Sequence, residues 1–98
     1  MRPGWQRLIE GMAFLGEIKV VEKTLQWSYG PWQAKLDEDW QLTISDRSRP
    51  GWAVWVHVQH PRALPTLAHG IKNPDMMAWA RQVLAAALQQ ADQESGGE

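Results

Sequence analysis

Residues 24–36 of this chain, TLQWSYGPWQAKL, decide its fold. Apolar and polar side chains alternate on both sides of Gly30-Pro31, and every second side chain of a strand points to the same face. Glycine and proline together favour a turn between the two halves. The stretch therefore predicts a β-hairpin with one apolar and one polar face.

The register of this hairpin follows from its turn. If Tyr29 lies opposite Trp32, then Trp27 lies opposite Ala34, and the apolar side chains of both strands share one face. Proline is not a favoured residue in a two-residue hairpin turn, so a slightly longer loop is an alternative. The register is self-consistent over both strands, and this consistency supports the hairpin.

Two more strands are predicted after the hairpin. Residues 40–45 alternate as a half-buried strand does, and residues 52–59 show the strongest alternation in the chain, with Trp, Val, Val and Val on one face. The acidic residues 37–39 and the Pro- and Gly-containing residues 46–51 are typical of connecting turns.

The segment before the hairpin also alternates, but out of phase. Ile18 and Val20 fall on a different face from Leu25, and a bulge near Val20-Val21 would restore the alternation. We interpret residues 17–29 as one bulged strand. The sequence thus predicts a four-stranded antiparallel meander with one apolar face.

Helices are predicted before and after the strands along the chain. Residues 5–15 carry apolar side chains at helical spacing, which predicts a short amphipathic helix. Residues 60–73 contain two prolines and read as an irregular crossing. Asn73-Pro74-Asp75 then has the capping residue, proline and acid that begin a helix, and a long apolar stripe follows it.

These elements predict an α+β fold. A short N-terminal helix, the four-stranded sheet and one long C-terminal helix are expected, with the long helix packed on the apolar sheet face, because such a face needs a cover. Residues 1–91 are predicted to form a single domain, and the Gly/Ser-rich residues 92–98 a disordered acidic tail.

Composition excludes several classes of protein. The 98 residues are 44% hydrophobic and 21% charged, as in one ordinary globular domain. No apolar run approaches the roughly 20 residues of a membrane span, and the N-terminus lacks the apolar core of a secretory signal. The chain has no cysteine, which excludes disulfides and thiolate sites and leads us to expect a cytoplasmic location.

The charge of the chain does not indicate a nucleic-acid-binding protein. Ten basic and eleven acidic residues give a formal net charge of −1, and without the predicted tail the balance is ten to eight. Lys and Arg are scattered, and neither a basic stripe nor a polybasic run is present. A membrane partner is therefore not expected.

No catalytic or metal-binding constellation is recognisable. The serines lie outside any G-x-S-x-G or S-x-x-K motif, and the acidic residues 37–39 fall at a solvated hairpin tip. His57 and His60 would point to opposite faces of a strand and could not chelate one metal together. We expect a protein without enzymatic activity, metal or cofactor.

Tryptophan is the unusual feature of the composition. The chain has seven Trp against one Tyr and one Phe, and six of the seven fall on predicted apolar faces. Trp55 instead shares a strand face with His57 and is predicted to lie in one row with polar residues, among them Lys35. An aromatic ring on a polar face is an accident of exposure, an anchor for a protein, or a platform on which bases stack.

We favour a protein contact over nucleic acid, because tryptophan is enriched in interface hot spots and a basic groove is lacking. The expected function is a small protein-binding module, an adaptor, regulator or inhibitor, whose partner is another protein or a second copy. The candidate residues for protein contact are Trp55, His57, Lys35, Ala78 and Ala85. The alternative, a weak nucleic-acid-binding domain, would use Trp55, Lys35, Arg47 and Arg49.

The predicted arrangement resembles known nucleic-acid binders in topology. A meander of four strands followed by a helix is similar to Whirly-type and coactivator-type single-stranded DNA binders, and the flanking helices loosely resemble those of double-stranded RNA-binding domains. The closing helix begins Asn73-Pro74-Asp75-Met76 and has no lysine cluster for phosphates. The resemblance thus covers topology alone.

Overall fold

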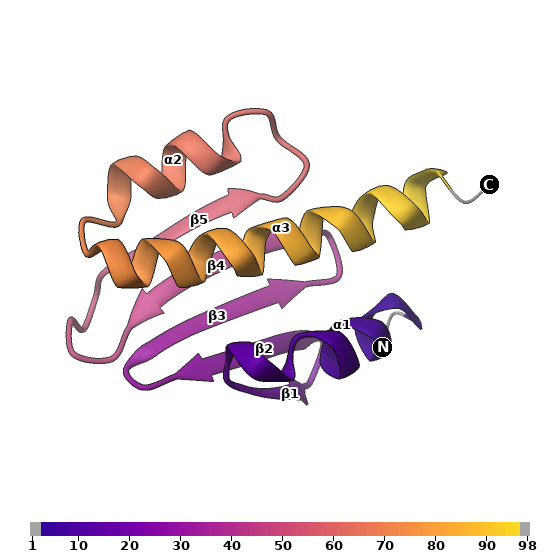
Figure 1. Cartoon of the computed structure of the whole chain (residues 1–98), viewed down its shortest axis with the longest axis horizontal. Coiled ribbons are helices and arrows are strands. Elements are labelled where there is room, and N and C mark those ends of the chain that lie inside the picture. Colours follow the sequence, from indigo (N-terminus) through magenta and orange to yellow (C-terminus); the bar gives the residue numbers. More distant parts are fainter. Residues whose placement is uncertain (1–2, 97–98) are drawn as a thin grey trace.

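The computed structural model describes residues 3–96, which form three α-helices, one 3-10 helix and a five-stranded sheet (Figure 1). The helical segments are α1 (Pro3–Gly11), η1 (Ala13–Leu15), α2 (Ala63–Gly70) and α3 (Pro74–Gly96). The strands are β1 (Glu17–Val21), β2 (Thr24–Tyr29), β3 (Trp32–Asp37), β4 (Gln41–Asp46) and β5 (Ala53–His57). The predicted α+β class, with a helix at each end of the sheet, is confirmed.

The sheet is an antiparallel meander in chain order, β1-β2-β3-β4-β5. The hairpin register predicted from the sequence is confirmed, with Tyr29 opposite Trp32 and Trp27 opposite Ala34. The turn between them has only two residues, because Gly30, at φ +59°, takes the left-handed position and Pro31 follows it. One face of the sheet therefore carries the apolar side chains, most of which are buried, and the other face is polar.

The number of strands corrects the sequence-based prediction of four. Residues 17–29 are not one bulged strand but two strands, β1 and β2, joined by the turn Glu22-Lys23. Glu22 has a φ of +56°, which lets the chain reverse there. After the reversal Val20 lies opposite Leu25 on the same face. The two segments alternate out of phase because they belong to different strands. This turn contains no glycine, asparagine or proline, so the sequence pattern did not predict it.

The long helix α3 covers the apolar face of the sheet, as predicted (Figure 1). Its first turn is capped by the side chain of Asn73, whose Oδ1 accepts the backbone N–H groups of Asp75 at 2.9 Å and Met76 at 3.1 Å. The buried side of the helix contributes Met76, Trp79, Ala80, Val83, Leu84, Ala87 and Ala91 to the core. No described helix is both long and apolar enough to cross a bilayer.

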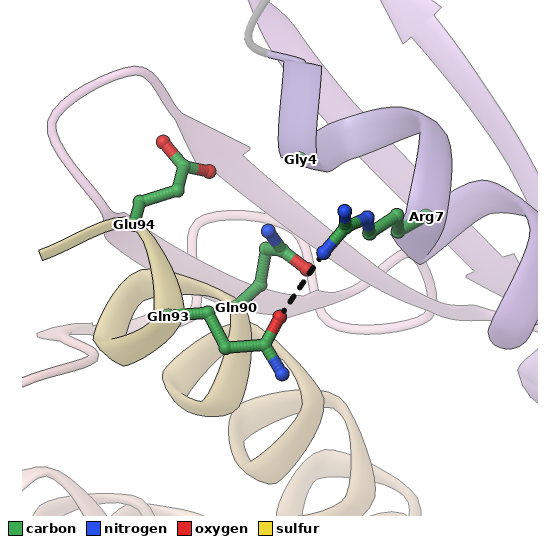
Figure 2. Close-up of a pocket in the computed structure, with 5 residues that line it drawn as sticks. All are labelled: Gly4, Arg7, Gln90, Gln93 and Glu94. Carbon is green, nitrogen blue, oxygen red and sulfur yellow. Dashed lines mark hydrogen bonds between the residues drawn. The ribbon is translucent and has the colours of Figure 1, made fainter. Parts of the chain in front are cut away.

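The C-terminal end of α3 packs against α1, where the sequence predicted a disordered tail from residue 92. The helix instead continues to Gly96, and residues 97–98 lie outside the described part of the chain. Figure 2 shows the junction: the Arg7 guanidinium donates a hydrogen bond to the Gln93 side chain at 3.5 Å. Gly4 lies so close to Gln90 and Glu94 that a Cβ there would overlap both side chains. This packing of α1 provides tertiary contacts for the last turns of α3.

A second helix, α2, lies where the sequence predicted an irregular crossing (Figure 1). Proline at position 65 falls in the first turn of α2, where a missing N–H breaks no intrahelical bond. The helix buries Ala63 and Leu67 and packs on β5, and Gly70 approaches Val54 so closely that a Cβ would overlap its side chain. The prolines thus begin a helix here rather than prevent one.

The tryptophans follow the predicted division in most positions. Trp5, Trp27, Trp40 and Trp79 are buried in the core, whereas Trp32 and Trp52 are half-buried and pack against it. Trp55 is exposed on the polar face. Six rings therefore belong to the apolar side of the molecule, and one does not.

Candidate functional site: the Trp55 hollow

Trp55 lies in the middle of β5, an edge strand of the sheet, on the face opposite α3. The residue is 69% exposed. Thr43 of β4 is its direct neighbour across the strand pair, so Trp55 lies in a row of polar residues as the sequence predicted. The ring thus stands beside small and polar side chains that do not cover it.

Two lysines lie in the same row across the sheet. Thr43 pairs with Lys35 of β3, Lys35 with Gln26 of β2, and Gln26 with Lys19 of β1. Because paired residues point to the same face, Trp55 and the two lysines share the polar face in one line. Both lysines are exposed.

A hollow of about 190 Å³ opens beside the Trp55 ring. His57 and Val56 of β5, His60 and Arg62 of the following turn, and Ala63 and Thr66 of α2 complete its lining. The sequence predicted that the two histidines point to opposite faces. They instead line the same hollow, because β5 ends at His57 and the chain turns before residue 60.

Hydrogen bonds orient both imidazole rings. Nδ1 of His57 accepts the backbone N–H of Gln59 at 3.2 Å, and Nδ1 of His60 accepts that of Arg62 at 3.0 Å. In the neutral ring the proton is then on Nε2, so each histidine offers an N–H donor. With the guanidinium of Arg62 and the hydroxyl of Thr66, the polar side chains of the lining are rich in donors and include no carboxylate among the described residues.

Arg47 and Arg49, the other two nucleic-acid candidates, are engaged at the end of the sheet. The guanidinium of Arg47 donates to the carbonyl of Gly30 at 2.5 Å, and its backbone N–H donates to Pro31 at 2.8 Å. The guanidinium of Arg49 lies over the Trp52 ring, 4.7 Å from its centroid. Neither arginine lines the Trp55 hollow.

The helix candidates Ala78 and Ala85 are exposed on α3, the helix that covers the opposite sheet face. Ala78 lies beside Trp79 in the wall of a separate groove. The predicted protein-contact residues therefore divide between two surfaces: Trp55, His57 and Lys35 on the polar sheet face, and the two alanines on α3.

Sequence reasoning missed the three other polar residues that line the hollow: His60, Arg62 and Thr66. His60 and Arg62 lie between β5 and α2, where no alternation assigns side chains to a face, and Thr66 lies in α2, a helix that the sequence did not predict. One signal was available, since His57, His60 and Arg62 form a short cluster of N–H donors at the end of the Trp55 strand and directly after it.

The acidic turn 37–39 is a structural feature in this fold. Oδ1 of Asp37 accepts the backbone N–H groups of Asp39 at 2.8 Å and Gln41 at 3.0 Å, which closes the turn between β3 and β4. Within residues 3–96, no group of three or more His, Asp or Glu side chains is placed to hold a metal ion. No family model, curated protein or solved structure matches this chain.

Proposed function

We propose that this chain is a small non-enzymatic module, an adaptor, regulator or inhibitor, that binds another protein through the Trp55 hollow in a reducing compartment such as the cytoplasm. The supporting observation is a tryptophan residue that is 69% exposed on a polar sheet face. Leaving so large an apolar ring in water is unfavourable, and a partner that covers the ring recovers that free energy. Tryptophan is enriched among residues that dominate binding energy for this reason.

The chemistry around the ring indicates an acidic partner segment. Arg62, His57 and His60 surround the hollow with N–H donors, and Lys35 lies two strands away in the Trp55 row. A carboxylate entering the hollow would meet donors and no like charge among the described lining residues. An apolar side chain next to that carboxylate would cover the ring. The fitting partner is a segment that carries an acidic residue beside an apolar one.

Single-stranded nucleic acid is the second candidate. The observation that favours it is the row in which Lys19 and Lys35 lie on the same face as Trp55, since bases stack on exposed rings and phosphates pair with lysine. Two observations favour the protein partner. The chain has a formal net charge of −1, which does not favour a phosphate backbone. The hollow, at about 190 Å³, has room for one side chain rather than for several successive nucleotides.

Indole N–H signals in a ¹⁵N-labelled full-length chain separate the two candidates, because each of the seven tryptophans gives its own signal. A Trp55→Phe variant identifies the Trp55 signal. We expect this signal to move on addition of a short peptide of alternating glutamate and leucine and to stay in place with oligothymidine at physiological salt. Arg62→Ala should weaken peptide binding by roughly tenfold. Arg81→Ala, an exposed arginine of α3, is the matched control and should leave binding unchanged.

Two results would count against the proposal. If the Trp55 signal does not move when the peptide is added, an acidic segment is ruled out as the partner. A signal that moves with oligothymidine, and does so much less at higher salt, replaces it with the nucleic-acid candidate.

Self-association is tested by light scattering on the wild type and on Trp55→Ala. A dimer that dissociates in this variant would place the second copy on the sheet face. A dimer that survives Trp55→Ala but dissociates in Ala85→Glu would place it on α3 instead. Monomers throughout would remove a second copy as the partner.

A further inference from the structure

A second groove, of about 500 Å³, lies on the helix side of the molecule, and four aromatic rings line it. Phe14 comes from η1, Tyr29 and Trp32 from the hairpin β2–β3, and Trp79 from α3. The β2–β3 turn and the first turns of α3 lie at the same end of the sheet (Figure 1). The groove is thus built by elements far apart in the sequence.

The rings form a connected and partly fixed wall. Tyr29 stacks on Trp32 with centroids 5.9 Å apart, and Trp32 meets Trp79 at 6.0 Å with the ring planes tilted by 42°. Trp79 is only 5% exposed, and its indole N–H is already bonded to the Leu15 carbonyl at 2.7 Å. The polar edge of Trp79 is therefore in use, and the small exposed part of its ring forms the inner wall of the groove.

The outer rings are open to solvent. Phe14 is 71% exposed and Tyr29 52% exposed, the two largest exposures of aromatic residues on this side of the molecule. No described segment of the chain covers them, so the groove presents aromatic surface to whatever enters it.

One acidic side chain supplies the formal charge of the groove among its described lining residues. This residue is Asp75, and Gln82 adds a neutral amide. The Asp75 backbone N–H bonds to Asn73 in the helix cap, and its carboxylate lies in the first turn of α3, where the helix dipole favours an anion. Arg47, at the neighbouring turn, is held by the Gly30 carbonyl and does not line the groove.

We propose that this groove binds a methylated ammonium group. The electron-rich faces of aromatic rings attract a cation, and a carboxylate beside them adds to the attraction. A primary ammonium is a strongly hydrated charge with three N–H donors, so stripping its water to place it against ring faces costs more free energy. A fully methylated ammonium has no donor and sheds water more readily. It therefore fits a site built of rings and one carboxylate, which lies on the face opposite the Trp55 hollow and is independent of it.

A methylated ammonium group can come from two sources, a free small molecule such as choline or a trimethylated lysine in a peptide. Both are titrated into the ¹⁵N-labelled full-length chain while the Trp32 and Trp79 indole signals, assigned with single Trp→Phe variants, are followed. We expect these signals to move with choline, with a dissociation constant on the order of 1 mM because partly exposed rings attract a cation weakly. Tighter binding of the trimethyl-lysine peptide than of an unmethylated one would identify a peptide source, and choline alone a free molecule.

A neutral control decides whether the positive charge matters. 3,3-Dimethylbutan-1-ol has the shape of choline without its charge, and we expect it to leave both indole signals unmoved. Asp75→Asn should weaken choline binding roughly fivefold. Asp39→Asn, at the exposed β3–β4 turn, is the matched control and should not weaken it.

Phe14→Leu keeps an apolar side chain at an exposed position but removes the ring, so it should weaken choline binding without lowering the unfolding temperature. The proposal is overturned if the neutral alcohol moves the two signals as choline does, if neither choline nor the trimethyl-lysine peptide moves them, or if Asp75→Asn binds choline as tightly as the wild type.

Discussion

The indole N–H of Trp79 donates a 2.7 Å hydrogen bond to the backbone carbonyl of Leu15, which lies 64 residues earlier in the chain. Both residues are buried, so the bond joins α3 to η1 inside the core. A buried carbonyl that loses its donor costs free energy, because no water replaces the donor. This bond therefore fixes both the packing of η1 and the orientation of the ring that forms the inner wall of the aromatic groove.

Trp79→Phe keeps an aromatic ring at this position but removes the donor. We expect the free energy of unfolding to fall by about 2 kcal/mol, from the unsatisfied carbonyl and the smaller ring together. Urea denaturation followed by circular dichroism measures the loss. Trp52→Phe is the control, since Trp52 is only half-buried and should lose less. Equal losses in the two variants would show that the hydrogen bond contributes little.

Gly16 is required where η1 passes into β1. Its φ is +128°, and a Cβ there would overlap the backbone carbonyl of Ser28. We expect Gly16→Ala to lower the free energy of unfolding by about 2 kcal/mol or more. Gly11, at the end of α1, has open space around it, and Gly11→Ala should be neutral or slightly stabilising. Chemical denaturation of both variants tests the contrast, which fails if the two alanines have the same effect.

The two-residue turn between β1 and β2 is strained at Glu22. A non-glycine residue at φ +56° costs about 1 kcal/mol relative to glycine, so Glu22→Gly should raise the free energy of unfolding by up to about that amount. Lys23→Gly, at the next position, has no such strain to relieve and should be neutral or destabilising. Thermal unfolding of the two variants compares them. A Glu22→Gly variant less stable than Lys23→Gly would contradict the turn at residues 22–23.

The turn after β4 makes stability depend on pH. The Ser48 hydroxyl donates to Asp46 at 2.6 Å and the Ser48 backbone N–H at 2.8 Å, and these bonds, with the nearby charge of Arg49, hold the pKa of Asp46 below its ordinary value of 3.8. A lowered pKa in the folded state stabilises the protein at pH values above 3.8, and this stabilisation is lost as the pH falls through the folded-state pKa.

Ser48→Ala removes the hydroxyl that contributes most to this effect. We expect the pKa of Asp46 to rise towards its ordinary value, measured by ¹³C NMR of the carboxyl group. The stability difference between wild type and variant should be present at neutral pH and shrink as the solution becomes more acidic. Ser45→Ala, which removes a hydroxyl of β4 that does not bond to Asp46, should leave the titration unchanged. A Ser48→Ala variant with an unaltered Asp46 titration would rule out the hydroxyl as the cause.

Strand faces were predictable from sequence because alternation is a local property. The hairpin register, the outward position of Trp55, the Asn73 cap and the apolar stripe of α3 all depend on spacing within a few residues, and all are as predicted. The missing fifth strand shows where this reasoning fails. The turn Glu22-Lys23 has no residue typical of turns, and the chain adopts it because β1 then pairs with β2.

Helices whose position depends on packing were harder to predict. The prolines of residues 60–73 led to the prediction of an irregular segment instead of α2, although a proline in the first turn of a helix breaks no helical hydrogen bond. The extent of α3 beyond residue 91 could not be inferred from its polar sequence, because the contact that accompanies it, α1 against the last turns of α3, joins opposite ends of the chain. The sequence of residues 92–96 alone therefore does not show that the helix continues there.

The sequence by itself determined the α+β class, the two faces of the sheet and the one tryptophan that faces solvent, because each follows from local periodicity. Only the tertiary structure decided what stands beside that ring: the turn after β5 brings His60 and Arg62 to the hollow at Trp55. It also assembled Phe14, Tyr29, Trp32 and Trp79 into one groove with Asp75. Side chains from separate elements meet only when the core packs, and the free energy that brings them together is spread over the whole apolar interior rather than held in any one segment.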